Sequence, residues 1–299
     1  TTSPKPSPLY ESNSFDSPVS PENELVHFSN IELPGPRLPH DMGLTENYVI
    51  LHDLPVILTE QGVKKGLWTI HQPRELPARF GIVPRRGSNA NIKWFETEHC
   101  YIYHVINSWE EGDEVVMTAC RMVDNGLNPS PEKYGPYVPM VAVLALHAVP
   151  CEWRFNMKTG ESKVRQLDDR IGEFPVINLD YAGRKARYSY HTSFDTKAET
   201  QIMNGLLKYD HDTGVCVPHM FEPGVYGSEA AFAPRIGAAS EDDGYVIVFV
   251  TDSNTMISEA RILDARQMEK APVARIQLPQ RVPGGFHGTW APGERLAVR

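Results

Sequence analysis

Three histidines that are far apart in the sequence stand where an imidazole ring could bind a metal ion: His40 in "LPHDMGLTENYVIL", His104 in "CYIYHVINSW" and His287 in "GGFHGTW". A proline restricts the backbone just before His40, at the entry to an expected strand. On a strand, His104 would share one inward face with Ile102 and Ile106, and a polar ring there needs a partner. The alternatives are a turn in which Asp41 caps local amides for His40, a core histidine bonded to a carbonyl for His104, and a surface histidine for His287. Most of the eleven histidines must have such roles.

Glycines and aromatic residues surround the last of these histidines. We expect Gly285 and Gly288 to let a strand-like segment carry His287 close to a crowded centre. Phe286 and Trp290 flank the same histidine. The alternative is a tight turn with a surface histidine.

Two glutamates occur in apolar and aromatic surroundings: Glu173 in "IGEFPVINLDYAGRKARYSY" and Glu229 in "YGSEAAFAPR". An unpaired carboxylate would be expensive there. A metal-bound imidazole offers its second N–H to such a group. The alternative is a salt bridge to one of four nearby arginines, namely Arg170, Arg184, Arg187 and Arg235.

Composition excludes some classes of function. The 299 residues carry a net charge of −9, with 38 acidic and 29 basic residues, which disfavours nucleic acid as a partner. The four cysteines form no C-x-x-C pair, so a zinc knuckle or a dense disulfide framework is not expected. No secretory signal pattern is present at the start of the sequence. These features predict a cytoplasmic protein with reduced thiols.

The positioning elements are predicted to be β-strands. Ser and Pro dominate the first residues, so 1–24 is predicted to be a flexible tail and 25–299 the folded domain. Short runs such as "NYVILHDLPVIL" and "DGYVIVFVTD" alternate with turn residues. The turns in "WRFNMKTGE" and "LKYDHDTGV" predict hairpins. The apolar run 138–150 is interpreted as one or two buried strands, and 193–210 is the best helix candidate.

Taken together, the motifs resemble one known family. "HDMGLTENYVILHDLPVIL", "RFGIVPRRG", "YIYHVINSWEEGDEVV", "FEPGVYGSEAAFAPR" and "LPQRVPGGFHGTW" follow one another in order, from about residue 25 to the end. They are similar to the carotenoid cleavage oxygenases, which include apocarotenoid, retinoid and lignostilbene-type dioxygenases. The resemblance implies an all-β fold, a seven-bladed β-propeller with a non-haem Fe(II) ion held by four histidines.

By this resemblance His40, His104 and His287 are metal ligands, and Glu173 and Glu229 orient the histidines. The family's first ligand histidine and first outer glutamate have no counterpart here. The only earlier histidine lies in "ELVHFSNI", which does not look like that motif. The chain thus resembles the C-terminal three-fifths of a member, an incomplete propeller of four or five blades. The missing blades would come from another segment or chain.

The implied reaction is oxidative cleavage of a conjugated C=C bond of a carotenoid, apocarotenoid or stilbene by O₂, giving two carbonyl products. Phe174, Phe286 and Trp290 are candidates for the lining of an apolar substrate tunnel, with core packing as the alternative. Peripheral membrane contact is compatible with such a substrate. The rival interpretations are a zinc hydrolase on the same histidines and a catalytically inactive propeller fragment that acts as a binding or regulatory module.

Overall fold

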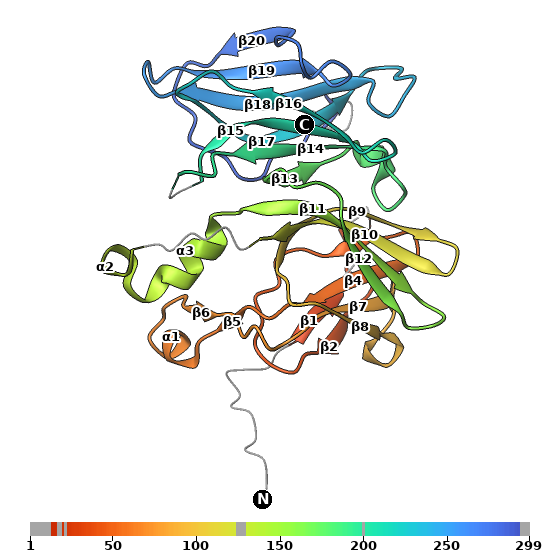
Figure 1. Cartoon of the computed structure of the whole chain (residues 1–299). Coiled ribbons are helices and arrows are strands. Elements are labelled where there is room, and N and C mark those ends of the chain that lie inside the picture. The colour runs from red at the N-terminus through yellow and green to blue at the C-terminus, as the bar shows by residue number, and fades with distance from the viewer. Residues whose placement is uncertain (1–12, 17–19, 21–22, 124–129, 199–200, 294–299) are drawn as a thin grey trace, which may run out of the picture. The chain divides into compact units, whose positions relative to one another are not determined.

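The computed structural model describes residues 13–16, 20, 23–123, 130–198 and 201–293, and most of its regular structure is β (Figure 1). The chain folds into two compact units. The first unit comprises Thr1–Leu144 and Cys151–Arg165, and the second comprises Ala145–Pro150 and Gln166–Arg299.

The first unit is built on two four-stranded antiparallel sheets. The strand order of one sheet is β3 (Gly43–Leu44), β4 (Tyr48–Asp53), β7 (Ala78–Pro84) and β8 (Lys93–Thr97). The order of the other is β12 (Ser162–Gln166), β11 (Ala148–Asn156), β10 (Glu114–Met122) and β9 (Ile102–Glu111). Consecutive hairpins of this kind are typical of propeller blades.

Smaller elements complete the first unit. Two-stranded sheets are formed by β1 (Asn13–Asp16) with β2 (Ser29–Glu32) and by β5 (Ile57–Leu58) with β6 (Ile70–His71). The helices are α1 (Glu60–Lys64), η1 (Asn89–Asn91), α2 (Pro131–Tyr134), η2 (Gly135–Tyr137) and α3 (Val138–Leu144). No helix among the described residues combines the length and apolar character that crossing a membrane requires.

The second unit also contains two four-stranded antiparallel sheets, whose strands follow the chain order. One consists of β13 (Gly172–Val176), β14 (Tyr188–Phe194), β15 (Met203–Asp210) and β16 (Val215–Met220). The other consists of β17 (Val225–Pro234), β18 (Gly244–Asp252), β19 (Ser258–Asp264) and β20 (Ala274–Gln277). Among the described residues of this unit, one helical turn is found, η3 (Leu179–Tyr181).

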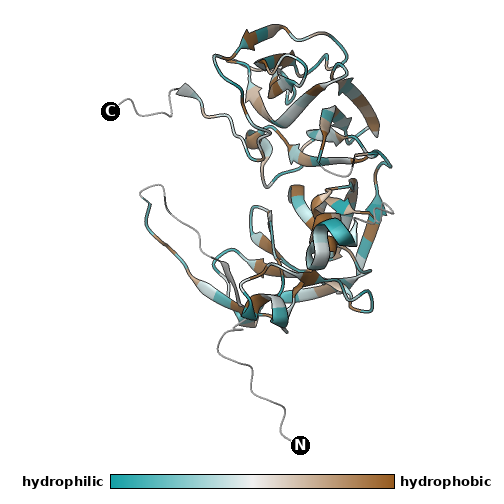
Figure 2. Cartoon of the chain, turned by 90° about the vertical axis from the view of Figure 1, so that its left-hand side faces the viewer, coloured by the Kyte–Doolittle hydropathy of each residue, from teal (hydrophilic) through white to brown (hydrophobic). Residues whose placement is uncertain are grey.

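Each unit has its own core of buried apolar side chains. Hydrophobic and hydrophilic residues alternate along many of the strands (Figure 2). In the first unit the ring centroid of Phe155 lies 5.3 Å from that of Phe80 and 5.3 Å from that of Phe95. In the second unit Tyr190 stacks on Phe232 at 5.5 Å. Such rings bury large apolar areas, so packing between sheets is the main stabilising contribution in each unit.

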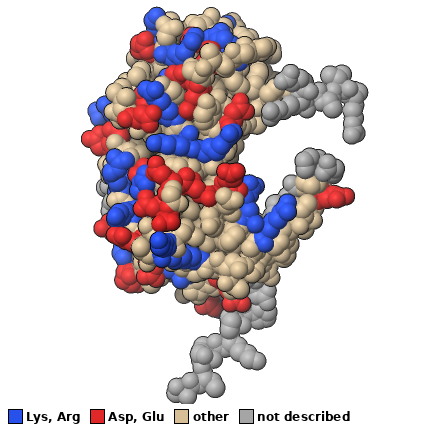
Figure 3. Space-filling model, turned by 90° about the vertical axis from the view of Figure 1, so that its right-hand side faces the viewer, with Lys and Arg blue, Asp and Glu red and all other residues tan. Residues whose placement is uncertain are grey.

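Charged side chains of both signs are interspersed on the face shown in Figure 3. Many of them form ion pairs at strand ends, for example Arg154 with Glu111 and Glu114 at 2.6 Å each, and Arg187 with Asp210 at 2.7 Å. Pairs that are this accessible to solvent contribute little to stability. They help to keep the sheet edges soluble, while the cores stabilise the fold.

The all-β propeller prediction is confirmed, and its hairpin turns are found as expected. Asn156 and Asp210 each accept backbone N–H groups two and three residues later, at 2.8–3.3 Å. Gly160 and Gly214 then follow with φ of +82° and +71°, a conformation that glycine adopts without strain. These two turns join β11 to β12 and β15 to β16.

Two local predictions were wrong. The helix expected over 193–210 is the end of β14 followed by β15; residues 199–200 lie outside the described part. Leu206 in β15 is fully buried, and Lys208 pairs with Asp242 at 2.7 Å, so tertiary packing overrides the helix-like pattern. The apolar run 138–150 begins with helix α3, and only its last residues enter β11. Periodicity does not separate a buried strand from a short helix in such a run.

The predicted flexible tail contains one short strand. Asn13–Asp16 pairs with Ser29–Glu32 in β2, so these residues take part in the fold. The remainder of 1–24 lies mostly outside the described residues, and the predicted domain boundary stays a prediction.

Candidate functional site

In the first unit, His40 and His104 lie side by side. Their ring centroids are 5.0 Å apart and their planes make an angle of 82°. His40 is not on a strand but in the loop before β3, whereas His104 is on β9. The Tyr103 ring lies 4.8 Å from that of His40 and limits how this imidazole can turn.

Asp41 connects the two histidine-bearing segments. Its Oδ1 accepts the N–H of Met42 at 2.7 Å, as expected for a turn-capping residue. Its Oδ2 accepts the N–H of Val105 at 2.7 Å, which is the residue directly after His104. This second hydrogen bond joins residues 64 positions apart, so no local pattern in the sequence announces it.

Gly43 allows the same segment to approach β9 closely. A Cβ atom at this position would lie 2.6 Å from Ser108 Oγ and 3.1 Å from the Cβ of Ile50. Real Cβ contacts are essentially never as short as the first distance, and the second is tighter than nine in ten of them and involves a fully buried residue of β4. Glycine is therefore required three residues after His40.

Glu110 fastens the far end of the segment. Its Oε1 accepts Thr45 Oγ1–H at 2.6 Å and the Asn47 N–H at 2.8 Å, and its Oε2 accepts Asn47 Nδ2–H at 3.0 Å. Partial burial opposes ionisation, but these hydrogen bonds outweigh it and hold the pKa of Glu110 below its usual range. The motif "HDMGLTEN" is thus attached to β9 at its start, middle and end.

Replacing Glu110 by glutamine should reduce the free energy of unfolding by about 1 kcal/mol at pH 7, because charge-assisted hydrogen bonds at an exposed site are lost. A lowered folded-state pKa means that this stabilisation is present above the unfolded-state pKa. It is lost as the pH falls through the folded-state pKa. Urea unfolding at pH 7 and at low pH should show the two proteins converging in acid. Glu161→Gln at an exposed site is the control, and a difference independent of pH would contradict the assignment.

Strand β9 is irregular around His104. Its pairing with β10 shifts register between Thr118 and Ala119 and again between Ala119 and Arg121. Bulges of this kind bend a strand and redirect its side chains, and they are common near functional sites. The simple alternation predicted for Ile102, His104 and Ile106 is therefore interrupted.

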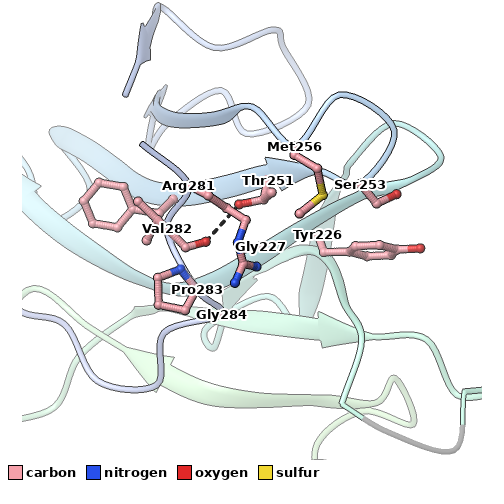
Figure 4. A pocket seen from close by; sticks show the side chains of 10 residues that line it. Tyr226, Gly227, Thr251, Ser253, Met256, Arg281, Val282, Pro283 and Gly284 are labelled. Carbon is pink, nitrogen blue, oxygen red and sulfur yellow. Dashed lines mark hydrogen bonds between the residues drawn. The ribbon is translucent and has the colours of Figure 1, made fainter. Parts of the chain in front are cut away.

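In the second unit, His287 lies in a segment that crosses β17 and β18 without forming a strand, contrary to the prediction. Hydrogen bonds hold this segment in place. Thr251 Oγ1–H donates to the Val282 carbonyl at 3.1 Å (Figure 4), and the Val282 N–H donates to Ser258 Oγ at 2.8 Å. The crowding expected around Gly288 is not found, since a Cβ there would meet nothing within 4 Å.

Glu229 holds the segment next to His287 and faces its ring. The Glu229 N–H donates to the Gly285 carbonyl at 3.3 Å, and Glu229 Oε2 accepts the Gly288 N–H at 2.7 Å. The same oxygen lies 3.3 Å from His287 Nδ1. An imidazole that donates Nδ1–H to a carboxylate presents Nε2 as its electron-pair donor, which is the arrangement of an oriented metal ligand.

Glu173 is the most completely buried acidic residue of the second unit, with 0% of its surface exposed. The backbone N–H of the following residue, Phe174, donates a hydrogen bond to the Glu173 carboxylate. Phe174 has φ of +50°, which is uncommon for a residue other than glycine. The backbone is thus held in an unusual conformation where it fixes the direction of this carboxylate.

The arginines proposed as alternative partners are engaged elsewhere. Arg170 pairs with Asp168 at 2.7 Å, Arg187 with Asp210 at 2.7 Å, and Arg235 with Asp243 at 2.9 Å. Arg184 donates to the carbonyl of residue 180 at 2.6 Å. These contacts give no support to the salt-bridge alternative for Glu173 and Glu229.

The candidate substrate-binding aromatics differ in exposure. Phe174 is buried and stacks on Phe286 at 5.6 Å, with the His287 ring 5.7 Å away. Phe286 and Trp290 are 53% and 43% exposed. They line a cavity of about 390 Å³ together with Glu229, His287 and apolar residues of β17 and β18, namely Ala231, Ile247 and Phe249.

Each unit therefore brings part of the predicted site together. His40 and His104 meet in the first unit. His287 and Glu229 meet in the second unit. There Phe174, the residue after Glu173, stacks on Phe286. The earlier histidine in "ELVHFSNI", His27, binds the Gly87 carbonyl through Nε2 at 2.8 Å, a structural role.

Comparisons with known proteins show the family to which the chain belongs. The sequence matches the family described as Retinal pigment epithelial membrane protein over residues 3–292. It is 37% identical to carotenoid 9,10(9',10')-cleavage dioxygenase 1 of Phaseolus vulgaris over 283 residues, which are 89% of this chain and 51% of that protein. It is 29% identical to lignostilbene-alpha,beta-dioxygenase isozyme III of Sphingomonas paucimobilis, covering 94% of this chain and 60% of the relative.

Among solved structures, the lignostilbene dioxygenase of Pseudomonas brassicacearum superposes with a TM-score of 0.78 at 27% identity, covering 92% of this chain and 59% of that one. The chain thus spans about half to three-fifths of the length of these relatives. Because the family match extends over almost all of the sequence, this chain belongs to the carotenoid cleavage oxygenase family, the family of the retinal pigment epithelial membrane protein.

Proposed function

We propose that this chain is part of a non-haem Fe²⁺ dioxygenase that cleaves a conjugated C=C bond of a carotenoid, apocarotenoid or stilbene. Both atoms of O₂ would enter the products, one in each of two new carbonyl groups. The observation that carries the proposal is the pair of adjacent, nearly perpendicular imidazoles of His40 and His104, with His287 oriented by a carboxylate in the second unit.

The donor set fits an iron ion. Imidazole is a suitable ligand for Fe²⁺, and two imidazole rings 5.0 Å apart are close enough to hold one ion between them. We propose His287 as the third ligand, with Nε2 as the binding atom. Bound Fe²⁺ would supply a site where O₂ is held and activated beside the alkene.

The carboxylates would act through the histidines. Glu229 is placed to accept Nδ1–H of His287, which fixes the tautomer and raises the basicity of the ring. We propose the same role for Glu173 towards another of the metal-bound imidazoles. Its complete burial and its hydrogen bond from Phe174 favour a single, fixed orientation of the carboxylate.

The cavity beside His287 suits an apolar conjugated ligand. Phe286 and Trp290 line it, and Phe174 stacks on Phe286 at 5.6 Å. A polyene or stilbene bound there would exclude water from the alkene. Its one acidic residue, Glu229, is already engaged with the segment that carries His287.

Further partners are also part of the proposal. We propose that the remaining blades and a fourth histidine come from another segment or chain. We also propose peripheral membrane contact through the region of α1, where Trp68 is 65% exposed and two lysines, Lys64 and Lys65, precede it. An exposed indole next to basic side chains suits an interface between lipid and water.

The test is metal analysis of protein purified without air, followed by incubation with O₂ and a panel of apocarotenoids and stilbenes. The expected result is iron in the protein and aldehyde products that require O₂. Zinc without alkene loss would favour the hydrolase. A folded protein that binds the panel but makes no aldehyde, alone or with the remaining blades, would favour the binding module.

A further inference from the structure

We infer that Asp41 is a positioning residue that fixes the His40 imidazole relative to that of His104. The inference rests on the proposed function, because it assigns a role to Asp41 only if these two histidines bind a common ion. It concerns the first unit alone. Here the carboxylate accepts hydrogen bonds from main-chain N–H groups that lie close in sequence to the two histidines.

The geometry of Asp41 suits this role. One oxygen accepts the N–H of Met42, two residues after His40, and the other accepts the N–H of Val105, one residue after His104. Both hydrogen bonds are 2.7 Å long, a typical length for bonds to a charged acceptor. A single carboxylate therefore links the main chain just after one histidine to the main chain just after the other.

Before His40, the segment is held at Leu38, whose N–H donates to the Val56 carbonyl at 3.0 Å and whose carbonyl accepts Tyr101 Oη–H at 2.8 Å. After His40, the first attachment is the one made by Asp41. His40 lies outside any strand, so no ladder of backbone hydrogen bonds fixes it. The register shifts of β9 occur on both sides of Val105, so the pairing with β10 is irregular where the second histidine is held. The attachments at Gly43 and Glu110 lie farther from His40 than Asp41 does.

The imidazole of His52 is close enough to Asp41 to feel its charge, but it does not form an ion pair with this carboxylate. Burial lowers the pKa of His52 to about 4, although the charge of Asp41 opposes that shift. His52 is therefore neutral at pH 7. Both of its ring nitrogens lack a hydrogen-bond partner within the described part of the chain. His52 therefore does not take up either of the backbone N–H groups that donate to Asp41.

Asparagine in place of Asp41 tests the inference with little change of shape. Its amide has one acceptor oxygen and one NH₂ group, so one of the two backbone N–H groups would face another donor. We expect the affinity of the whole chain for Co²⁺, used as the probe ion and measured by equilibrium dialysis, to fall 10- to 100-fold. At saturation the Co²⁺ absorption bands should also change shape, since the ligand geometry is altered.

Two controls keep the outcomes distinct. Asp252→Asn removes a carboxylate that likewise accepts two backbone N–H groups in a turn, those of Asn254 and Thr255, and it should leave Co²⁺ affinity and spectrum unchanged. His104→Ala should abolish binding. If His104→Ala abolishes binding and Asp41→Asn keeps both affinity and spectrum, the inference about Asp41 is wrong and the metal site stands. If His104→Ala also binds Co²⁺ normally, the proposed metal site itself is wrong.

Discussion

Replacing His104 by alanine is expected to abolish iron binding. In the first unit its ring lies 5.0 Å from that of His40, so the substitution removes one of two adjacent ligands. The proposed iron site would lose one of the imidazole ligands on which its retention of Fe²⁺ depends. Iron per chain, measured after anaerobic reconstitution and desalting, should fall to background.

The matched control is His71→Ala on β6. His71 is an exposed histidine that we assign no role in metal binding, and its loss should leave the iron content at the level of the unmodified protein. Circular dichroism of both variants should retain the β spectrum, because neither side chain belongs to the apolar cores. Full iron content in His104→Ala would show that the ion is held elsewhere and would remove the basis of the proposed function.

The fold could be predicted where local chemistry decides the conformation. Turns such as those after Asn156 and Asp210 are specified by a side chain that accepts nearby N–H groups and by a glycine that follows. The predictions of local structure were wrong where contacts between distant residues decide the conformation. Lys208 is buried against Asp242, 34 residues away, and this contact stabilises β15 in a stretch that has the pattern of a helix.

The candidate site could be predicted only in part, for the same reason. The resemblance of the motifs around His40, His104 and His287 to one family implies metal ligands, but it does not show what holds the rings. The hydrogen bond from Val105 to Asp41 and those from Thr45 and Asn47 to Glu110 join residues more than 60 positions apart. The sequence suggested a local turn for Asp41, and that is half of its role.

Replacing Glu173 by glutamine is expected to leave the fold and the bound iron in place and to lower turnover about 10- to 100-fold, as changes to groups that orient metal ligands commonly do. Glutamine has nearly the same shape, so a fully buried site should accommodate it. The measurements are kcat, KM and iron content of the complete protein. Glu161→Gln, at an exposed turn, is the control and should match the unmodified enzyme.

The expected defect follows from the donors around this side chain. The Phe174 N–H already donates to the Glu173 carboxylate, and the positive φ of Phe174 fixes the direction of that N–H. Glutamine has only one acceptor oxygen, which this donor would use. Its NH₂ group would then meet the N–H of a metal-bound imidazole, two donors in contact, and the ring would lose both its orientation and the negative charge that raises its basicity. Loss of iron would contradict this assignment, because Glu173 would then be needed to hold the ion. Unchanged kcat with iron retained would also contradict it, because Glu173 would then orient no ligand.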